Sequence, residues 1–154
     1  MKKITFVLLS LLMASISLMA QTTKPETGLV NKTNCGSFWR FDFNYETIDA
    51  DGETPVVLSA AIFMTNSVYS KTVKAKGCGL LNHYTISDDK SRPTNVSSFF
   101  TLEGLLSNTN YIIIESDGFG FGIDVKRNQK YLQGRATARV NIDAFIAGRK
   151  ILED

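Results

Sequence analysis

Alternating and continuous apolar runs along the chain predict a sheet-containing fold. In residues 38–47 (FWRFDFNYET), aromatic and polar residues alternate, which is the period of a strand with one buried face. Asp51-Gly52 is typical of a hairpin turn. The next run, residues 55–64 (PVVLSAAIFM), is almost continuously apolar and predicts a more deeply buried strand. The two segments are therefore expected to form an antiparallel hairpin.

Shorter patterns extend this hairpin into an α/β arrangement. Residues 77–82 predict a third strand, and the β-branched run 111–115 predicts a fourth. Between them, Ser97 and Ser98 are expected to cap a short helix. Residues 135–152 predict a second helix, with one apolar face formed by Ala136, Val140, Ala144, Ala147 and Ile151. The predicted fold class is α/β, a hairpin followed by strand, helix, strand and helix, with about four strands and two helices.

The aromatic row of the first strand supports two interpretations. Its members are Trp39, Phe41, Phe43 and Tyr45. An aromatic row on one face of a strand is usually part of a hydrophobic core, and we predict that role here. The alternative is a ligand-binding platform exposed on the sheet.

Residues 1–20 have the pattern of a secretory signal peptide. Lys2 and Lys3 precede an apolar run from Phe6 to about Leu18, which is shorter than the ~20 residues of a membrane-spanning helix. A membrane anchor is the alternative. We expect cleavage after Ala20 and a secreted or periplasmic protein with no stable membrane anchor. Residues 21–37 are then a mobile polar lead, and residues 38–154 form one domain.

The balance of charge excludes two classes of partner. The sequence has 17 Lys and Arg against 15 Asp and Glu, and the signal peptide accounts for two of the lysines. The mature chain is therefore formally neutral. Nucleic-acid binding and binding to anionic membranes both need a basic excess, so neither is expected.

Two cysteines, Cys35 and Cys78, each lie beside glycine. In an exported protein such a pair can form a disulfide, and the alternative is two buried thiols. Sequence separation does not decide whether the Cα atoms approach closely enough.

The C-terminal third of the chain resembles secreted lipases and related α/β-hydrolases. In that family the fourth strand ends in Asp-Tyr-x-Gly-x-Gly, followed by His-Pro-Tyr-Leu. The corresponding residues here are Asp117, Gly120, Gly122, Tyr131 and Leu132. An earlier strand of the family ends in His-Gly-Thr, and His83-Tyr84-Thr85 stands in that place. The family's Ser-Ala-bearing apolar strand is matched by Leu58-Ser59-Ala60-Ala61.

This resemblance covers residues 38–154 and implies the opening half of an α/β-hydrolase domain. The family's strand order is 1-2-4-3-5, so the strand at residues 111–114 is expected inside the sheet. Asp117 is expected to hold the loop after its strand, and His83 to belong to the oxyanion loop. Tyr84 replaces the glycine that lets a backbone N–H approach a developing negative charge. Tyr131 is expected to pack or to line a pocket.

The catalytic half of the family's machinery has no counterpart in this sequence. Hydrolases of this fold place the nucleophile in Gly-x-Ser-x-Gly, and that motif does not occur here. His83 is the single histidine. The resemblance therefore implies the N-terminal portion of an exported serine hydrolase, acting on ester, lipid or peptide bonds in the full-length family and inactive as given.

Two other functions remain open at this point. One is an exported, non-catalytic binding module that uses the aromatic strand. The other is a small enzyme in which His83 acts as a base with Asp88 or Asp89 and a nearby serine. No cofactor is implied, and Asp117 and Asp124 are too isolated to suggest a metal site. We also expect self-association, because strands of the complete family sheet are missing here.

Overall fold

The computed structural model of the chain describes residues 25–82, 88–129 and 133–154. Predictions for the signal peptide, for the loop His83, Tyr84 and Thr85, and for Tyr131 lie outside the described residues.

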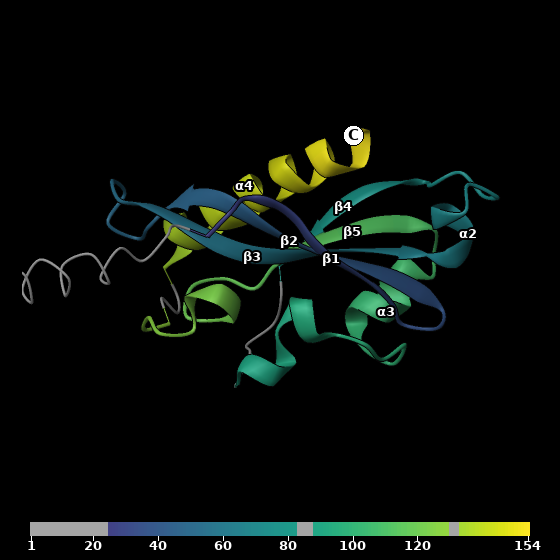
Figure 1. Cartoon of the computed structure of the whole chain (residues 1–154), viewed down its shortest axis with the longest axis horizontal. Coiled ribbons are helices and arrows are strands. Elements are labelled where there is room, and N and C mark those ends of the chain that lie inside the picture. The colour runs from purple at the N-terminus through teal and green to yellow at the C-terminus, as the bar shows by residue number, and fades with distance from the viewer. Residues whose placement is uncertain (1–24, 83–87, 130–132) are drawn as a thin grey trace, which may run out of the picture.

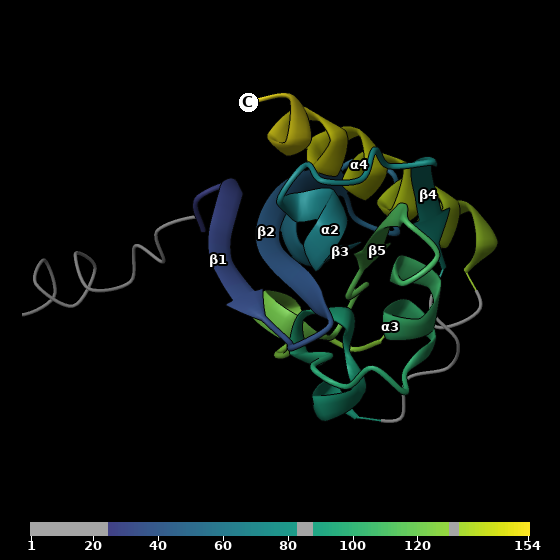
Figure 2. The ribbon, with the colours of Figure 1, turned by 90° about the vertical axis from the view of Figure 1, so that its right-hand side faces the viewer.

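Five strands form one mixed sheet. They are β1 (Gly28–Asn34), β2 (Phe38–Ile48), β3 (Pro55–Thr65), β4 (Gly77–Leu81) and β5 (Tyr111–Ser116). Their spatial order is β1-β2-β3-β5-β4, which can be followed from one edge to the other in Figure 2. Only the β4–β5 pair is parallel. The expected order of the four predicted strands is confirmed, with β5 inside the sheet.

The β2–β3 hairpin is the longest pairing in the sheet. Its register runs from Phe38 opposite Thr65 to Ile48 opposite Pro55 without a break. The turn is closed by the Asp49 N–H, which donates to the Thr54 carbonyl oxygen at 2.8 Å. This confirms the hairpin that the alternation and the Asp-Gly turn predict.

Strand β1 was not predicted, because its sequence GLVNKTN lacks the alternation of a half-buried strand. It is an edge strand paired only with β2, and most of its residues are exposed. Backbone hydrogen bonds hold such a strand without a buried face, so hydrophobic periodicity cannot reveal it. Part of the expected polar lead, from Gly28 to Asn34, is therefore ordered into the sheet.

Helix α4 (Gly134–Glu153) covers one face of the sheet, as Figure 1 shows. It confirms the predicted C-terminal helix and packs against the main core. Gly148 allows the close approach, since a Cβ there would lie 2.9 Å from Ile114 Cδ1 and 3.2 Å from Phe43 Cζ. The buried residues of this core are Phe41, Phe43, Tyr45, Val56, Leu58, Ala60, Ile62, Met64, Val68, Ile114, Phe119, Ala136, Val140 and Ala144.

The opposite face carries short elements and a smaller core. Helix α3 (Leu102–Ser107) and the 3-10 turns η1 (Asp89–Ser91) and η2 (Pro93–Asn95) lie on the side of the sheet away from α4 (Figures 1 and 2). A smaller core lies between these elements and the sheet, and its buried residues are Phe38, Ala61, Phe63, Val96 and Ile113. The remaining elements are α2 (Asn66–Tyr69), which follows β3, and η3 (Gly122–Asp124).

The predicted cap of α3 is wrong. Thr101, rather than Ser97 or Ser98, occupies the N-cap, and its Oγ1 accepts from the Gly104 N–H at 3.2 Å. Ser98 Oγ accepts instead from the Phe100 N–H at 3.2 Å, in the turn before the helix. Several Ser and Thr residues precede the apolar run, and the turn decides which of them caps the helix.

The two cysteines are free thiols, so the disulfide alternative is wrong. Cys35 packs against the smaller core and Cys78 against the main core, on opposite faces of the sheet. Burial raises the pKa of both thiols.

Among the described residues, no helix has both the length and the apolar character needed to cross a membrane.

Candidate functional site at the end of strand β5

The parallel strands β4 and β5 end at the same edge of the sheet. Leu81 lies opposite Glu115, so the chain leaves both strands at neighbouring points. In α/β sheets, ligands bind beside the carboxyl ends of parallel strands. After Asn82, residues 83–87 lie outside the described chain, whereas the residues that follow β5 are described as far as position 129. Asp117 is the first residue after β5.

Asp117 is completely buried and forms the centre of a polar network. Its Oδ2 accepts from Ser59 Oγ at 2.5 Å and from Thr94 Oγ1 at 2.6 Å. Its Oδ1 accepts from the Thr94 N–H at 2.9 Å. Arg92 adds an ion pair, with Nε 3.7 Å from Oδ2. We call these four residues the Asp117 network; it ties β3 and the η2 turn to the end of β5.

Burial raises the pKa of Asp117, against the lowering effect of its hydrogen bonds from Ser59 and Thr94 and of the Arg92 charge. Hydrogen bonds and a nearby cation stabilise a carboxylate, while loss of solvent disfavours it. The upward direction shows that burial outweighs the partners. The described geometry gives Asp117 a structural role, holding together the segments that border the strand ends.

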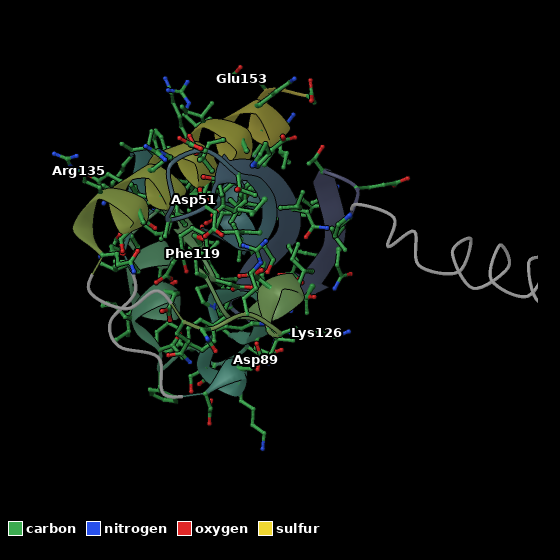
Figure 3. The ribbon with its side chains drawn as sticks, turned by 90° about the vertical axis from the view of Figure 1, so that its left-hand side faces the viewer. Asp51, Asp89, Phe119, Lys126, Arg135 and Glu153 are labelled. Carbon is green, nitrogen blue, oxygen red and sulfur yellow. The ribbon has the colours of Figure 1, made fainter. Side chains whose placement is uncertain are left out.

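A glycine-rich turn completes this region. Gly120 and Gly122 both have positive φ, +79° and +59°. The Gly122 N–H donates to Asp89 Oδ1 at 2.8 Å, and the Gly120 N–H donates to Asp124 Oδ2 at 2.9 Å. In Figure 3, Asp89 lies on the side of the molecule away from α4, and Phe119 points into the interior. Asp89 is also ion-paired with Arg92, so the turn is linked to the Asp117 network.

Gly122 packs so closely that a side chain there has no space. A Cβ would overlap Ser59 Oγ and would lie 2.5 Å from Asp117 Oδ2. Its positive φ is also unfavourable for residues other than glycine. The spacing of Gly120 and Gly122 after Asp117 is thus explained by the backbone of this turn.

Gly122→Ala is expected to lower the free energy of unfolding by about 1–3 kcal/mol through backbone strain alone, and by more through overlap with Ser59. Urea unfolding measures the loss. Gly36→Ala, with φ +88° and open space around the Cβ, reports strain without overlap. Gly134→Ala, in open space at the start of α4, reports neither. Equal stability of Gly122→Ala and Gly134→Ala would show that the turn is not constrained as described.

The structure brings together only part of the predicted site. Asp117 is bonded to Ser59 and Thr94, from earlier segments of the chain, while the Gly120 and Gly122 N–H groups donate to Asp124 and Asp89. Thr94, Arg92 and Asp89 were not predicted to join this site. They occur in the polar stretch 87–94 (SDDKSRPT), which has the composition of an ordinary surface loop. No local pattern distinguishes a loop residue that reaches a buried carboxylate 23 positions later.

The aromatic row of β2 belongs to the core. Phe41, Phe43 and Tyr45 are buried under α4, and Tyr45 Oη lies 2.6 Å from Ser116 Oγ. Trp39 is partly buried and packs against Tyr69 in a tilted arrangement, with ring centroids 4.5 Å apart. These contacts leave no broad aromatic surface on β2 for a ligand.

Other described polar groups do not define a second site. Within residues 25–82, 88–129 and 133–154, no three His, Cys, Asp or Glu side chains are grouped so as to hold a metal ion. A surface hollow of about 430 Å³ lies beside η3, lined by Pro25, Pro55, Val56, Val57, Ile123, Asp124 and Arg127. Arg127 is engaged there by Asp49 at 2.7 Å and Asp124 at 3.1 Å.

Comparison with solved structures relates this arrangement to hydrolases. The rice cell wall degrading esterase LipA from Xanthomonas oryzae superposes with a TM-score of 0.61 at 18% identity, over 87% of this chain and 38% of LipA. A provisionally assigned hydrolase from Legionella pneumophila superposes with a TM-score of 0.60 at 12% identity, over 84% of this chain and 39% of that one. No protein-family model and no curated protein matches the sequence.

The chain therefore has a partial α/β-hydrolase-like fold. It spans about two fifths of the length of the hydrolase structures that it matches. At this level of identity the similarity establishes the fold alone.

Proposed function

We propose that this chain is the N-terminal portion of an exported serine hydrolase, of the class that cleaves ester, lipid or peptide bonds. The observation that carries the proposal is the superposition of 87% of the chain on 38% of an esterase. The Asp117 network supports it, because it braces the segments beside the carboxyl ends of β4 and β5, where such sheets bind ligands. The signal-like pattern of residues 1–20 supports export.

In this proposal the described residues build the scaffold of an active site and do not supply its nucleophile. The sequence has no Gly-x-Ser-x-Gly motif. The described serines nearest the strand ends are committed to other contacts, with Ser59 bonded to Asp117 and Ser116 to Tyr45. A serine nucleophile needs a general base within hydrogen-bond reach. The single histidine, His83, lies outside the described residues.

The chain is accordingly expected to show no esterase or peptidase activity by itself. Removing a catalytic triad leaves only residual catalysis even in a complete enzyme. A serine-reactive fluorophosphonate probe should leave the purified chain unlabelled, while a known serine esterase in the same tube is labelled. Stoichiometric labelling of any serine in this chain would overturn the proposal. Mass spectrometry of the labelled peptide would then identify the nucleophile.

The proposal also includes self-association, or association with a missing C-terminal half. The alternative of a non-catalytic binding module with an aromatic strand face is not favoured, because that face is covered by α4.

A further inference from the structure

Two carboxyl side chains, one on β5 and one on α3, are buried beside each other with most of their oxygen atoms unpartnered. Glu115 lies on β5 and is 0% exposed, and Glu103 lies on α3 and is 3% exposed. Within the described part of the chain, neither Glu115 oxygen and not the Oε2 of Glu103 has a partner. Native proteins rarely bury polar groups in this way without a functional or conformational reason.

Among the described residues that pack around this pair, no Lys or Arg neutralises it, and Arg40 of β2, on the same face of the sheet, is bonded to Asp42 and to the Val96 carbonyl oxygen. Glu115 faces the same side of the sheet as Ile113, opposite Ala61 of β3 and Leu81 of β4. Strands β3, β4 and β5 and helix α3 contain no Lys or Arg. The titratable thiol of β4, Cys78, packs on the other face of the sheet. The nearby acid after β5 is Asp117, whose own cation is Arg92 from the turn between η1 and η2.

An ionised carboxylate in such a place is strongly unfavourable, so the neutral acid is the form that fits the fold. Burial, the neighbouring Glu103 carboxyl and the charge of Asp117, in that order, raise the pKa of Glu115 to about 9. The acid is therefore neutral at pH 7 in the folded chain. It would be ionised at that pH when exposed to water.

Helix α3 is weakly attached to the sheet by its apolar residues. It has six residues, and the three that it buries are Glu103, Gly104 and Ser107. Leu102 and Leu105 are 43% and 48% exposed, so the apolar side of this helix points outward. Only Leu106 adds a partly buried apolar contact to the smaller core. Helix α3 therefore has few apolar contacts that could offset the cost of a charge on Glu115 beside it.

We propose that α3 is a pH-dependent latch, closed on the sheet while the Glu115 carboxyl beside Glu103 keeps its proton and released when Glu115 ionises. The folded-state pKa of Glu115 lies above its unfolded value, so the closed state binds the extra proton. Its stabilising effect is complete below the unfolded pKa, declines as the pH rises, and is lost at the folded pKa. Release would free the segment that leads from η2 into α3, next to the Asp117 network.

Amide hydrogen exchange across α3 tests the latch directly. The Leu105 N–H donates to the Thr101 carbonyl oxygen at 3.0 Å, and the Asn108 N–H donates to the Gly104 carbonyl oxygen at 3.3 Å. Their protection, corrected for intrinsic exchange, should fall about tenfold per pH unit between about pH 6 and pH 9, as expected for the release of one proton. In Glu115→Gln the same amides should keep nearly constant protection.

An infrared measurement detects the proton on Glu115 directly, whether or not the substitution also changes the stability of the chain. At about pH 7 the wild-type chain should show the infrared C=O stretch of a neutral carboxylic acid, and Glu115→Gln should lack it. Glu153→Gln is the matched control, because Glu153 is exposed on α4, points outward in Figure 3 and pairs with Arg149. This control should keep both the band and the pH dependence of the wild type.

The latch is overturned if the wild type lacks the neutral carboxyl band, or if Glu115→Gln retains the wild-type dependence of α3 protection on pH. Where Glu115→Gln does not fold, Glu103→Gln replaces it. Removing the neighbouring acid lowers the Glu115 pKa, so the decline in α3 protection should level off at a lower pH than in the wild type. An unchanged profile in Glu103→Gln would equally contradict the latch.

Discussion

Replacing Asp117 by alanine is expected to lower the free energy of unfolding by about 3–5 kcal/mol, the usual cost of removing one partner from a buried charged network. The change deletes the acceptor of three hydrogen bonds, from Ser59 Oγ, Thr94 Oγ1 and the Thr94 N–H. These donors stay buried or partly buried, and Arg92 loses its buried partner. Against a typical domain stability of about 5–15 kcal/mol, this loss is enough to unfold a marginal chain.

Urea unfolding at constant pH measures the effect, and Asp154→Ala at the exposed end of α4 is the control. A double-mutant cycle with Ser59→Ala tests the network itself. If Ser59 acts through Asp117, the Ser59→Ala change should cost less in the Asp117→Ala background than in the wild type. Additive effects, or an Asp117→Ala chain as stable as the control, would contradict the network as the brace of this region.

The elements that the sequence predicts correctly are those with a clear hydrophobic period. Strand β2 alternates, β3 is continuously apolar, and α4 carries one apolar stripe, so each period matches the surface that the element buries. The order of these strands followed from the family resemblance, because periodicity does not specify which strands are neighbours. The edge strand β1 has no buried face and was missed for that reason.

Alternation was misleading where the second face of β2 is also covered. Arg40 belongs to the polar set of the alternating run, yet it is 8% exposed. Its Nη1 donates to the Val96 carbonyl oxygen at 2.7 Å, and its Nε pairs with Asp42 Oδ1 at 2.7 Å. A period of two identifies two faces, but it does not show that a later loop covers the polar one.

The candidate site was only partly predictable for a related reason. Asp117, Gly120 and Gly122 form a local motif, whereas Ser59, Asp89 and Thr94 reach them from distant segments. The burial of Glu103 and Glu115 is harder still to predict from the sequence, because a lone acid in an apolar strand or a short helix is ordinarily placed at the surface. Only the packing of α3 on β5 shows that both are buried.

The outer edge of β4 is expected to cause self-association of the chain from residue 21 onward. Strand β4 pairs with β5 on one side, and no described strand pairs with its other side. An open edge presents unpaired N–H and C=O groups to other strands. Leu80 on this strand is 42% exposed, and α4, which contacts β4, exposes Ile142 and Ile146. Each large apolar side chain left uncovered forfeits roughly 1.5–3 kcal/mol.

Size-exclusion chromatography and urea unfolding of residues 21–154 test this expectation. The wild-type chain should elute above the monomer mass in a concentration-dependent way, or should unfold without one cooperative transition. Leu80→Lys should shift the chain toward the monomer, because a charge on an edge strand opposes pairing with another chain. Val30→Lys is the matched control on β1, at the opposite edge of the sheet, where the side chain is already 62% exposed. A stable wild-type monomer with one cooperative transition would instead favour a self-contained module, in which β4 needs no neighbouring strand.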